Sequence, residues 1–492
     1  MWIRVFRVLA CVLPVAATLL AAPAAAQGIR EYPSGPPFRG APDDNFTFRD
    51  LRAELKNKMT GTFTVASVAD MFWNSPVTER MSPQLREVMR NADTTIGNLE
   101  GRDYWYFRDS AKALQALGVD LVAPGEGELH RYPDVEKLVG ALGEFGIKMP
   151  GFGPNLTMAR RPVFHELPQG RVAFLAACPG ATLCGDRATD GGALARGTPG
   201  VNPLGLTVWN TVTAEQFNQL KAILTSVLAR GTEPDVLVPS DPEPPLPPGR
   251  LMLWGQRFMI AAKPGELHYE VNPGDEQALI LSVRNAKEVA DFSVFHMHSH
   301  LNRYSFQQYS HDNYPADYMR PFLHKLIDNG LDMYVGSGNH SMQGIEIYKG
   351  RPIFYNQGNA GVDLTRRPDS PPNRGNLTGT EAREEQAAEL QDEPASVAFL
   401  ANTTYRDGRL VEVRIYPMDV GIGRRPWSRE NIPETPPPAL ARSILERVQK
   451  YSEPFGTKIS IENNIGIIRV PPEATVDVGG DLVIPGRQPR AR

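Results

Sequence analysis

The sequence predicts an α/β protein in which strands and helices alternate along the chain. Apolar runs of strand length, such as Val172 to Ala177, recur between segments whose apolar residues follow helical spacing. One such segment runs from Val135 to Phe145 and stops at Gly146. Of the 492 residues, 41% are hydrophobic and 22% are charged, which is typical of a globular chain with a sizeable core. Alternating units of this kind indicate a layered fold whose functional residues follow the strands.

The first residues are typical of a secretory signal peptide. Arg4 and Arg7 precede an apolar run from Val8 to Leu20, and Ala24 to Ala26 offer a cleavage site. An uncleaved anchor is the alternative, but the apolar run is short for a membrane span. We therefore expect residues 1–26 to be removed, leaving a periplasmic or secreted protein with no membrane span.

Charge and cysteine content restrict the partners and the redox state. The net charge of −4 argues against a nucleic-acid partner, which would favour a basic face. Only Cys178 and Cys184 remain after removal of the signal peptide. In an exported protein they can form a disulfide that closes a small loop, or they can stay as buried free thiols.

The first half of the chain alternates strands and helices from Gly61 onwards. A helix is expected after Ser82, because serine accepts hydrogen bonds from free N–H groups at a helix start and Pro83 suits the first helical position. A second helix is expected to begin at Ser110 and to end at Gly118. The strands between these helices are rich in β-branched and apolar residues, and we expect them over 62–68, 94–99, 120–123 and 172–177.

The second half continues this pattern after a Gly-rich loop. Thr213 and Gln216 form the two ends of a capping box, so we expect a helix that reaches about Arg230. Lys349-Gly350 and Asp407-Gly408 are turn dipeptides between strand-like runs, and each predicts a β-hairpin. Apolar spacing predicts the remaining elements, which are helices over 275–290, 315–329 and 439–451 and strands over 292–297, 333–336 and parts of 457–485.

The chain is expected to hold one main domain over residues 61–421. A lead-in rich in proline, glycine and charge precedes it over 27–60 and is expected to be extended. An irregular proline-rich insertion (234–250) and a polar loop with the composition of a disordered segment (364–394) interrupt the domain. Residues 422–492 are expected to add a helix and short strands that pack on the core.

Several expected strands end in side chains that can bind a metal or move a proton. In chain order these side chains are Asp70, Asn98 with Glu100, His296 with His298 and His300, and Asn339 with His340. Carboxylate, amide and imidazole groups that come from separate strand ends suit a divalent ion such as Mn, Fe, Zn or Mg. Such an ion polarises a phosphoryl or carbonyl oxygen and lowers the pKa of bound water.

Each of these residues also has a purely structural interpretation. Asp70 can cap a turn or helix, and Glu100 can be an acidic residue at a helix start. The three alternate histidines share a face if the strand continues to His300, but paired core or surface histidines are the alternative. His340 lies on a Gly-rich turn, where a polar turn residue is common.

Segments along most of the chain resemble, in order, the motifs of the CapA-like family, which is associated with poly-γ-glutamate capsule synthesis. The matching segments include Val65–Asp70, Ala92–Glu100, Gly151–Leu156, Thr198–Leu204, Leu326–Asp332 and Ile353–Asn359. The most specific match is the stretch 335–355, which contains His340. The resemblance covers about residues 61–465.

The resemblance implies a calcineurin-like metallophosphatase fold, with two packed β-sheets flanked by helices and the site at the strand ends. Carried over by position, the implied metal ligands are Asp70, Glu100, His298 and His340. The implied proton carriers are Glu126 and His300. The remaining candidates are expected to contact substrate: Asn98, Asn339 and His296, of which His296 has no counterpart in the family.

The chain departs from the family at two places. Gly125 and Glu126 stand where the family has an Asn and a His, and Gly338 stands where its last turn has a first His. In phosphatases of the superfamily the replaced His helps to protonate the leaving group, a role worth about 10²–10⁴-fold in rate.

Two functions remain open. One is a metal-dependent hydrolase or transferase that acts on an envelope or capsule polymer of the poly-γ-glutamate or phosphoester type, or on a small-molecule substrate. The other is a catalytically impaired polymer-binding or assembly protein that works with other capsule-synthesis proteins.

Overall fold

The structure is a computed structural model, and it describes residues 51–72, 80–99, 107–125, 132–180, 186–192, 196–228, 246–304, 313–362, 396–421, 432–476 and 478. The chain divides into two units, 1–50 and 51–492, and all described residues belong to the second. The expected signal peptide (1–26), the polar loop (364–394) and most of the insertion (234–250) lie outside the described residues. No helix in the described part is long and apolar enough to cross a membrane.

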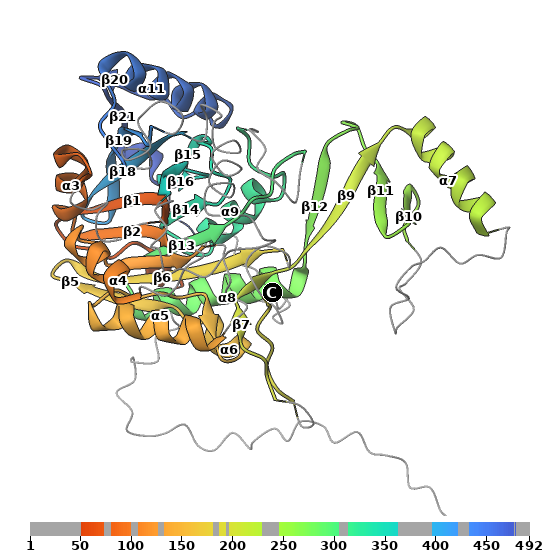
Figure 1. Ribbon diagram of the computed structural model, residues 1–492, viewed down its shortest axis with the longest axis horizontal. Coiled ribbons are helices and arrows are strands. Elements are labelled where there is room, and N and C mark those ends of the chain that lie inside the picture. Colours follow the sequence, from red (N-terminus) through yellow and green to blue (C-terminus); the bar gives the residue numbers. More distant parts are fainter. Residues whose placement is uncertain are drawn as a thin grey trace, which may run out of the picture. The chain divides into compact units, whose positions relative to one another are not determined.

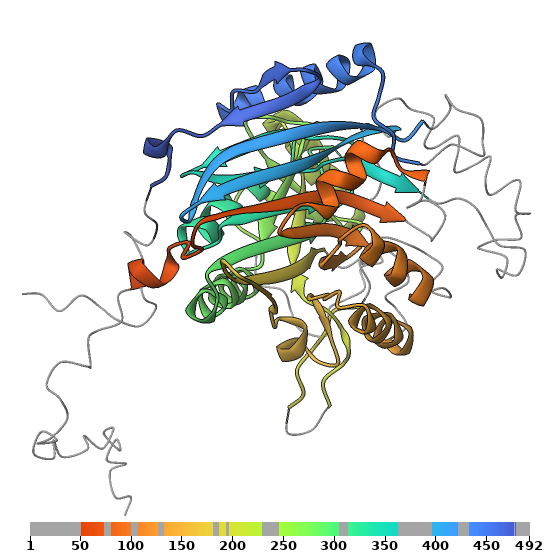
Figure 2. The same cartoon turned by 90° about the vertical axis from the view of Figure 1, so that its left-hand side faces the viewer.

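The first large sheet has eight strands in the order β20-β21-β19-β18-β1-β2-β3, with β17 also paired to β1. Its strands are β1 (Thr62–Phe72), β2 (Thr94–Leu99), β3 (Leu121–Pro124), β17 (Asn359–Val362), β18 (Val397–Arg406), β19 (Arg409–Asp419), β20 (Ser460–Glu462) and β21 (Ile465–Arg469). β1 runs parallel to β2 and β17 and antiparallel to β18. Figure 2 shows the long strands β18 and β19 side by side, with β18 next to β1. The carboxyl ends of β1, β2 and β17 therefore meet at one edge.

The second large sheet has seven strands in the order β15-β16-β14-β13-β6-β5, with β8 also paired to β6. Its strands are β5 (Val163–Leu167), β6 (Gly170–Pro179), β8 (Pro203–Leu204), β13 (Phe292–His298), β14 (Met333–Ser337), β15 (Ile345–Tyr348) and β16 (Arg351–Phe354). β6, β13, β14 and β16 form a parallel centre, so they also share a carboxyl edge.

The two large sheets pack face to face around one hydrophobic core. Phe63 and Tyr405 from the first sheet stack at 4.8 Å, and Phe292 from the second lies 5.2 Å and 4.9 Å from them. All three side chains are at most 2% exposed. Burying such rings contributes about 1.5–3 kcal/mol each. The predicted sandwich of two β-sheets is therefore confirmed.

Helices cover the outer faces of both large sheets (Figure 1). Against the first sheet pack α3 (Pro83–Arg90), α4 (Phe107–Ala116) and α5 (Tyr132–Glu144). Against the second pack α8 (Pro273–Val289) and α9 (Met319–Asp328), while α11 (Pro438–Ser452) contacts β15, β19 and β21. Shorter elements are α1 (Leu51–Leu55), α6 (Leu156–Ala159), β4 (Phe152–Gly153), β7 (Gly200–Val201) and the 3₁₀ turns Glu453–Phe455 and Pro472–Ala474.

A separate four-stranded sheet, in the order β10-β11-β9-β12, was not expected from the sequence. Its elements are β9 (Leu206–Val212), α7 (Ala214–Leu228), β10 (Arg250–Leu253), β11 (Gln256–Ile260) and β12 (Leu267–Val271). Figure 1 shows α7 beside β10 and β11, where Phe217 packs on Leu251 and Leu253. The predicted capping box of α7 is confirmed, because Gln216 N donates to Thr213 Oγ1 at 3.1 Å and Thr213 N donates to Gln216 Oε1 at 2.9 Å.

Three local predictions were wrong. Ser82 is the N-cap residue of α3 and Pro83 begins the helix, as predicted, but the Ser82 side chain makes no capping hydrogen bond, since its hydroxyl pairs with Thr435 Oγ1 at 2.9 Å. α4 begins at Phe107, before the expected Ser110, and its first turn carries Asp109, which suits the positive end of a helix. Residues 51–55, within the lead-in expected to be extended, form α1.

Both predicted hairpins are confirmed. At β15–β16 the turn residues Lys349 and Gly350 have φ of 50° and 75°, and at β18–β19 Asp407 and Gly408 have φ of 47° and 74°. Positive φ at both central positions is the mark of the tight turn that suits twisted strands.

Candidate functional site

The candidate site lies where the carboxyl ends of strands from both large sheets meet. Strand pairing sets Asp70 of β1 beside Asn98 of β2 on one side and Asn359 of β17 on the other. In the second sheet His298 of β13 pairs with Ser337 of β14. All five side chains are at most 2% exposed. Polar groups buried to this extent need partners, so their contacts define what the site can hold.

Three polar atoms form a tight triangle at the centre of the site. Asn98 Nδ2 donates to Asp70 Oδ1 at 2.8 Å and lies 3.1 Å from His298 Nδ1. The third edge, from Asp70 Oδ1 to His298 Nδ1, is 3.7 Å long, which exceeds hydrogen-bonding distance. The carboxylate and the imidazole therefore face a common point without bonding to each other.

The triangle fits a divalent ion. The three atoms lie on a circle of about 1.9 Å radius, so a point about 2.1 Å from each, the usual metal–oxygen or metal–nitrogen bond length, exists just off their plane. Asn98 Oδ1 is buried and has no hydrogen-bond partner among the described residues. A half-turn of this carboxamide exchanges its nitrogen and oxygen and gives the ion an oxygen donor.

The fit depends on the carboxamide as third donor. In the described part of the chain, no three His, Cys, Asp or Glu side chains gather as a metal-binding group. Glu100, a predicted ligand, and Glu126, a predicted proton carrier, lie outside the described residues.

A network of imidazoles continues from the triangle. His298 Nε2 lies 2.9 Å from His300 Nε2, and Ser337 Oγ lies 3.0 Å from His296 Nε2 and 3.2 Å from His298 Nδ1. Burial lowers the pKa of His296 to about 3. Burial, together with the neighbouring imidazoles, lowers the pKa of His298 well below its ordinary value. Both rings are therefore neutral near pH 7 and keep a lone pair for a metal or a donor.

The turn after β14 ties the two sheets together. Gly338 N donates to both carboxylate oxygens of Asp70, at 3.2 Å and 3.1 Å. Gly338 has φ of 101°, and a Cβ there would lie 2.7 Å from Ser299 N and 3.0 Å from His298 Nε2. This backbone therefore has no room for the histidine that the family has at this position. His340 also has a left-handed backbone, with φ of 53°, a strained conformation that clusters at functional sites.

The structure brings together most of the described residues that the sequence singled out. His296 and His298 share contacts with Ser337, although β13 ends at His298 rather than continuing to His300. The rings of His300 and His340 lie 5.4 Å apart between centroids. Asn339 Nδ2 lies 3.4 Å from Ser341 Oγ, on the same turn.

Two functional candidates were missed by the sequence analysis. Ser337 links His296 and His298, and Asn359 Nδ2 lies 3.2 Å from His340 Nδ1. Ser337 directly follows the predicted strand 333–336 and is the last residue of the observed β14, so the strand-end criterion could have found it. Asn359 follows no predicted strand, and only the pairing of β17 with β1 shows its position. Cys178 is disulfide-bonded, and its expected partner, Cys184, lies outside the described residues.

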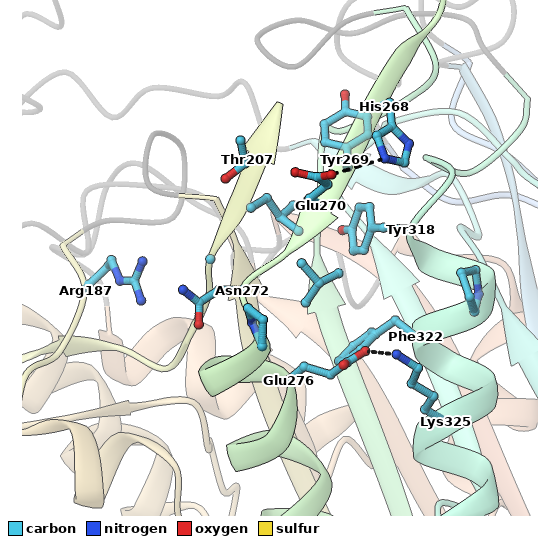
Figure 3. Close-up of a pocket in the computed structure, with 15 residues that line it drawn as sticks. Arg187, Thr207, His268, Tyr269, Glu270, Asn272, Glu276, Tyr318, Phe322 and Lys325 are labelled. Carbon is cyan, nitrogen blue, oxygen red and sulfur yellow. Dashed lines mark hydrogen bonds and ion pairs between the residues drawn. The ribbon is translucent and has the colours of Figure 1, made fainter. Parts of the chain in front are cut away.

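A pocket of about 720 Å³ lies elsewhere, between β9, β12, α8 and α9 (Figure 3). None of the strand-end residues lines it. Its charged side chains have partners: Arg187 pairs with Asp275 at 2.8 Å, Lys325 with Glu276 at 2.7 Å, and Glu270 with Arg250, while His268 Nδ1 lies 2.6 Å from Asp317 Oδ2. Because these charged groups already have partners, the pocket is the weaker candidate for metal chemistry.

Comparisons with known proteins agree with the resemblance that the sequence motifs carry. The family model of the bacterial capsule synthesis protein PGA_cap matches residues 58–363. An uncharacterized protein of Sinorhizobium fredii, y4sH, is 30% identical over 466 residues, which are 86% of this chain and 96% of that protein. The PGA biosynthesis protein CapA of Bacillus subtilis is 37% identical over 102 residues, 20% of this chain and 25% of that protein.

One solved structure is also similar. It is a putative 5′-nucleotidase from Staphylococcus aureus in complex with alpha-ketoglutarate, with a TM-score of 0.31 and 8% identity over 71% of this chain and 52% of that chain.

Proposed function

Because the chain belongs to the bacterial capsule synthesis protein PGA_cap family, we propose that it is an exported, metal-dependent hydrolase or transferase. Its substrate is a capsule or envelope polymer of the poly-γ-glutamate or phosphoester type. The observation that carries the proposal is the triangle of Asp70, Asn98 and His298, whose edges match the spacing of ligands around one divalent ion.

Each residue of the triangle has a defined task in this proposal. Asp70 supplies the negative charge, and the Gly338 N–H orients its carboxylate. His298 gives the Nδ1 lone pair, and Asn98 gives its carboxamide oxygen. Glu100 is proposed as a further ligand. This donor set suits Mn, Fe, Zn or Mg, and the ion would supply a Lewis acid that polarises the scissile bond.

The imidazoles around the triangle would carry protons. His300 is proposed to carry the proton. With Nδ1 of His298 on the ion, the Nε2–H of His298 would donate a hydrogen bond to Nε2 of His300, 2.9 Å away, and orient that ring. Glu126 is proposed as a second carrier. With the Nδ1 lone pair of His298 on the ion, the Ser337 hydroxyl would bond to His296 Nε2, 3.0 Å away. Burial keeps water out of this network, which strengthens each electrostatic contact.

A second function is favoured by the two glycines that replace family side chains. Gly125 has no side chain where the family has an Asn, and its N–H bonds to Leu99 O at 2.9 Å. Gly338 cannot be replaced by a histidine without a clash. A protein that keeps the fold but has lost these groups could bind the polymer, or assemble with other capsule-synthesis proteins, without turnover.

Metal analysis combined with turnover separates the two functions. The full chain would be purified, its Mn, Fe and Zn content measured, and its activity tested on poly-γ-glutamate and on a phosphoester after metal addition. If the protein is the proposed enzyme, the wild type should contain stoichiometric metal and turn over a substrate. Asn98→Leu should lose both the metal and the turnover, and the control His268→Gln should retain both. Polymer binding without turnover would favour the assembly protein. If the wild type showed no bound metal and no turnover, the hydrolase proposal would be overturned.

A further inference from the structure

The pocket between β9, β12, α8 and α9 has the size of a ligand site, and one end of it carries hydrogen-bond donors. Its volume of about 720 Å³ lies within the usual range for small-molecule sites. Arg187 and Asn272 both line it. Figure 3 shows these two side chains at one end of the pocket, across from His268 and Lys325. The chemistry of this end can therefore be considered by itself.

Arg187 shares its carboxylate partner with a second arginine. Asp275 accepts hydrogen bonds from Arg187 Nη2 at 2.8 Å and from Arg160 Nη2 at 3.0 Å. It also accepts from Gly205 N at 2.9 Å. The two arginines and the aspartate hold two positive charges and one negative charge. Arg187 is 43% exposed and has five N–H donors, and Asp275, which is buried, keeps Arg160 if Arg187 also binds a ligand. Arg187 can thus bind an anion without leaving a buried carboxylate unpaired.

Asn272 adds a donor whose orientation is fixed by the backbone. Its Oδ1 accepts hydrogen bonds from Gly274 N at 2.9 Å and from Asp275 N at 3.0 Å, in the first turn of α8. Backbone N–H groups only donate, so the oxygen must lie there and Nδ2 must face the other way. Figure 3 shows this nitrogen on the Arg187 side of the carboxamide. The donor that Asn272 offers to a ligand is therefore its side-chain Nδ2, whereas these N–H groups of the helix are already used.

Gly205 leaves space between the two donors. A Cβ at Gly205 would lie 3.1 Å from Arg187 Nη1 and 3.2 Å from Asn272 Cβ, so these two atoms are at most about 6.3 Å apart. Hydrogen bonds of about 2.7–2.9 Å to one shared oxyanion fit this separation. We propose that Arg187 and Asn272 form an oxyanion site, which binds a carboxylate or phosphate group of the substrate chain away from the bond that reacts. The use by a substrate chain rests on the proposed hydrolase function, whereas the oxyanion site does not.

The pocket lies within reach of the strand-end site. Tyr269 lines the pocket, and its hydroxyl donates to Asn302 O at 2.8 Å. Asn302 follows His298 by four residues, so the Tyr269 hydroxyl lies within about 20 Å of the His298 backbone. A chain of about six monomers covers this length. The oxyanion site would therefore favour long substrates, because it binds a part of the chain that a single monomer does not have.

Binding to metal-free protein tests the site without turnover. The full chain would be treated with chelator, dialysed and titrated calorimetrically with a γ-linked glutamate hexamer, a six-unit polyphosphate, free glutamate and inorganic phosphate. We expect one of the two chains to bind, and Arg187→Gln to weaken this binding about 10-fold or more, the usual loss for a hydrogen bond to a charged group. Arg414→Gln, which removes a surface pair with Glu412, should not weaken it.

The titration distinguishes a chain from a free anion. If neither chain binds the wild type, or if Arg187→Gln binds as tightly as the wild type, the oxyanion site is wrong. If free glutamate or phosphate binds as tightly as the six-unit chains, the pocket is a site for a free anion and the role in chain binding is overturned.

Asn272→Asp separates ligand binding from folding. Aspartate caps a helix as well as asparagine does and suits its positive end, so the free energy of unfolding should stay close to that of the wild type. It also replaces the Nδ2 donor by a charged oxygen, so the anion should bind at least 10-fold more weakly. Asn155→Asp, at the N-cap of α6 and outside the pocket, should change neither quantity. Unchanged anion affinity in Asn272→Asp would contradict the proposal.

Steady-state kinetics of the metal-loaded protein test the role in substrate binding. Arg187→Gln should raise KM for the chain that binds by about 10-fold or more with little change in kcat, because it removes binding that the ground state and the transition state share. A lower kcat with unchanged KM would place Arg187 at the reacting bond and would overturn the proposed role. A wild type without metal or turnover would refute the hydrolase, while the titration would still decide the oxyanion site.

Discussion

Two histidine–aspartate pairs in this chain differ in the gap between their partners. At the pocket, His268 Nδ1 lies 2.6 Å from Asp317 Oδ2, and the side chains are 37% and 40% exposed. At the strand ends, His298 Nδ1 lies 3.7 Å from Asp70 Oδ1, and the side chains are 1% and 0% exposed. A distance of 2.6 Å is a direct hydrogen bond, whereas 3.7 Å leaves room for an ion that bonds to both. We call the His268–Asp317 pair closed, because its partners bond directly. We call the His298–Asp70 pair open, because its partners are too far apart for a hydrogen bond. The same residue types thus form a closed pair at the surface and an open pair in the interior.

The surroundings of the two pairs explain this difference. Water and matched counter-charges satisfy the exposed pair, so its contact indicates only a modest surface interaction. The buried pair has no solvent to complete its polar groups, and the Asn98 carboxamide beside it keeps an unpartnered oxygen among the described residues. An open buried pair is therefore the better indicator of a ligand than a charged pocket.

The largest effect is expected when the charge at the open pair is removed. Asp70→Asn should lower the affinity for Mn or Zn by more than about 10²-fold, since even supporting residues around a metal contribute about 10–100-fold. The matched change at the closed pair, Asp317→Asn, should leave the affinity within error. Isothermal titration with each metal measures both. Equal losses in the two variants would remove the distinction between an open and a closed pair.

The second effect concerns the backbone that keeps the buried pair open. Gly338→Ala should lower the free energy of unfolding by about 2–4 kcal/mol, because a Cβ strains the left-handed backbone and meets Ser299 N at 2.7 Å. Gly146→Ala is the matched control. Gly146 has φ of 78° but no atom within 4 Å of the added Cβ, so only about 1 kcal/mol of backbone strain is expected.

Urea unfolding measures both glycine variants. If the two substitutions lower the free energy of unfolding by the same amount, the close approach of Gly338 to the end of the His298 strand contributes nothing to stability.

Much of the buried region could be predicted from the sequence. The strand Thr94–Leu99 has the predicted bounds, and the strands ending near Asp70 and His298 were found because their segments are rich in β-branched and apolar residues. Their polar end residues were found because functional groups follow strands in layered folds. The strand-end rule therefore located the open pair before any distance was known.

The exposed region could not be predicted in the same way. β12 does alternate apolar and polar residues, with Leu267 and Tyr269 buried, but it has only five residues, whereas β9 buries Trp209 and Thr211 without such an alternation. Asn359 also escaped prediction, because its position beside Asp70 depends on parallel pairing between segments far apart in the chain. Sequence patterns report what each strand buries, but not which distant strand it pairs with.

A third carboxylate gives a buried but closed contact for comparison. Glu346 accepts hydrogen bonds from Tyr355 OH at 2.6 Å, Arg320 Nη2 at 2.9 Å and His324 Nε2 at 3.0 Å. Burial alone would raise the pKa of Glu346, but these hydrogen bonds outweigh burial and leave its pKa below the ordinary 4.5. Ionised Glu346 therefore stabilises the fold above about pH 4.5, and this contribution is lost as the pH falls through the lower folded-state pKa.

Glu346→Gln should consequently lower the free energy of unfolding at neutral pH by about 1–3 kcal/mol. The deficit should shrink below pH 4.5, where the wild type loses its own charge contribution. Metal content should not change. Urea unfolding across this pH range tests the sign, and a deficit that stayed constant with pH would show that shape rather than charge makes Glu346 stabilising.

The smallest effect is expected at the exposed pair. His268→Gln should lower the free energy of unfolding by less than about 1 kcal/mol, because an interaction between side chains that are 37% and 40% exposed is largely replaced by water. It should also leave the metal content at the wild-type value. Thermal unfolding and metal analysis of the same preparation check both expectations. A loss as large as that of Glu346→Gln would mean that the closed pair at the pocket contributes to the fold as much as a buried one, and exposure would then no longer explain why the two histidine–aspartate pairs differ.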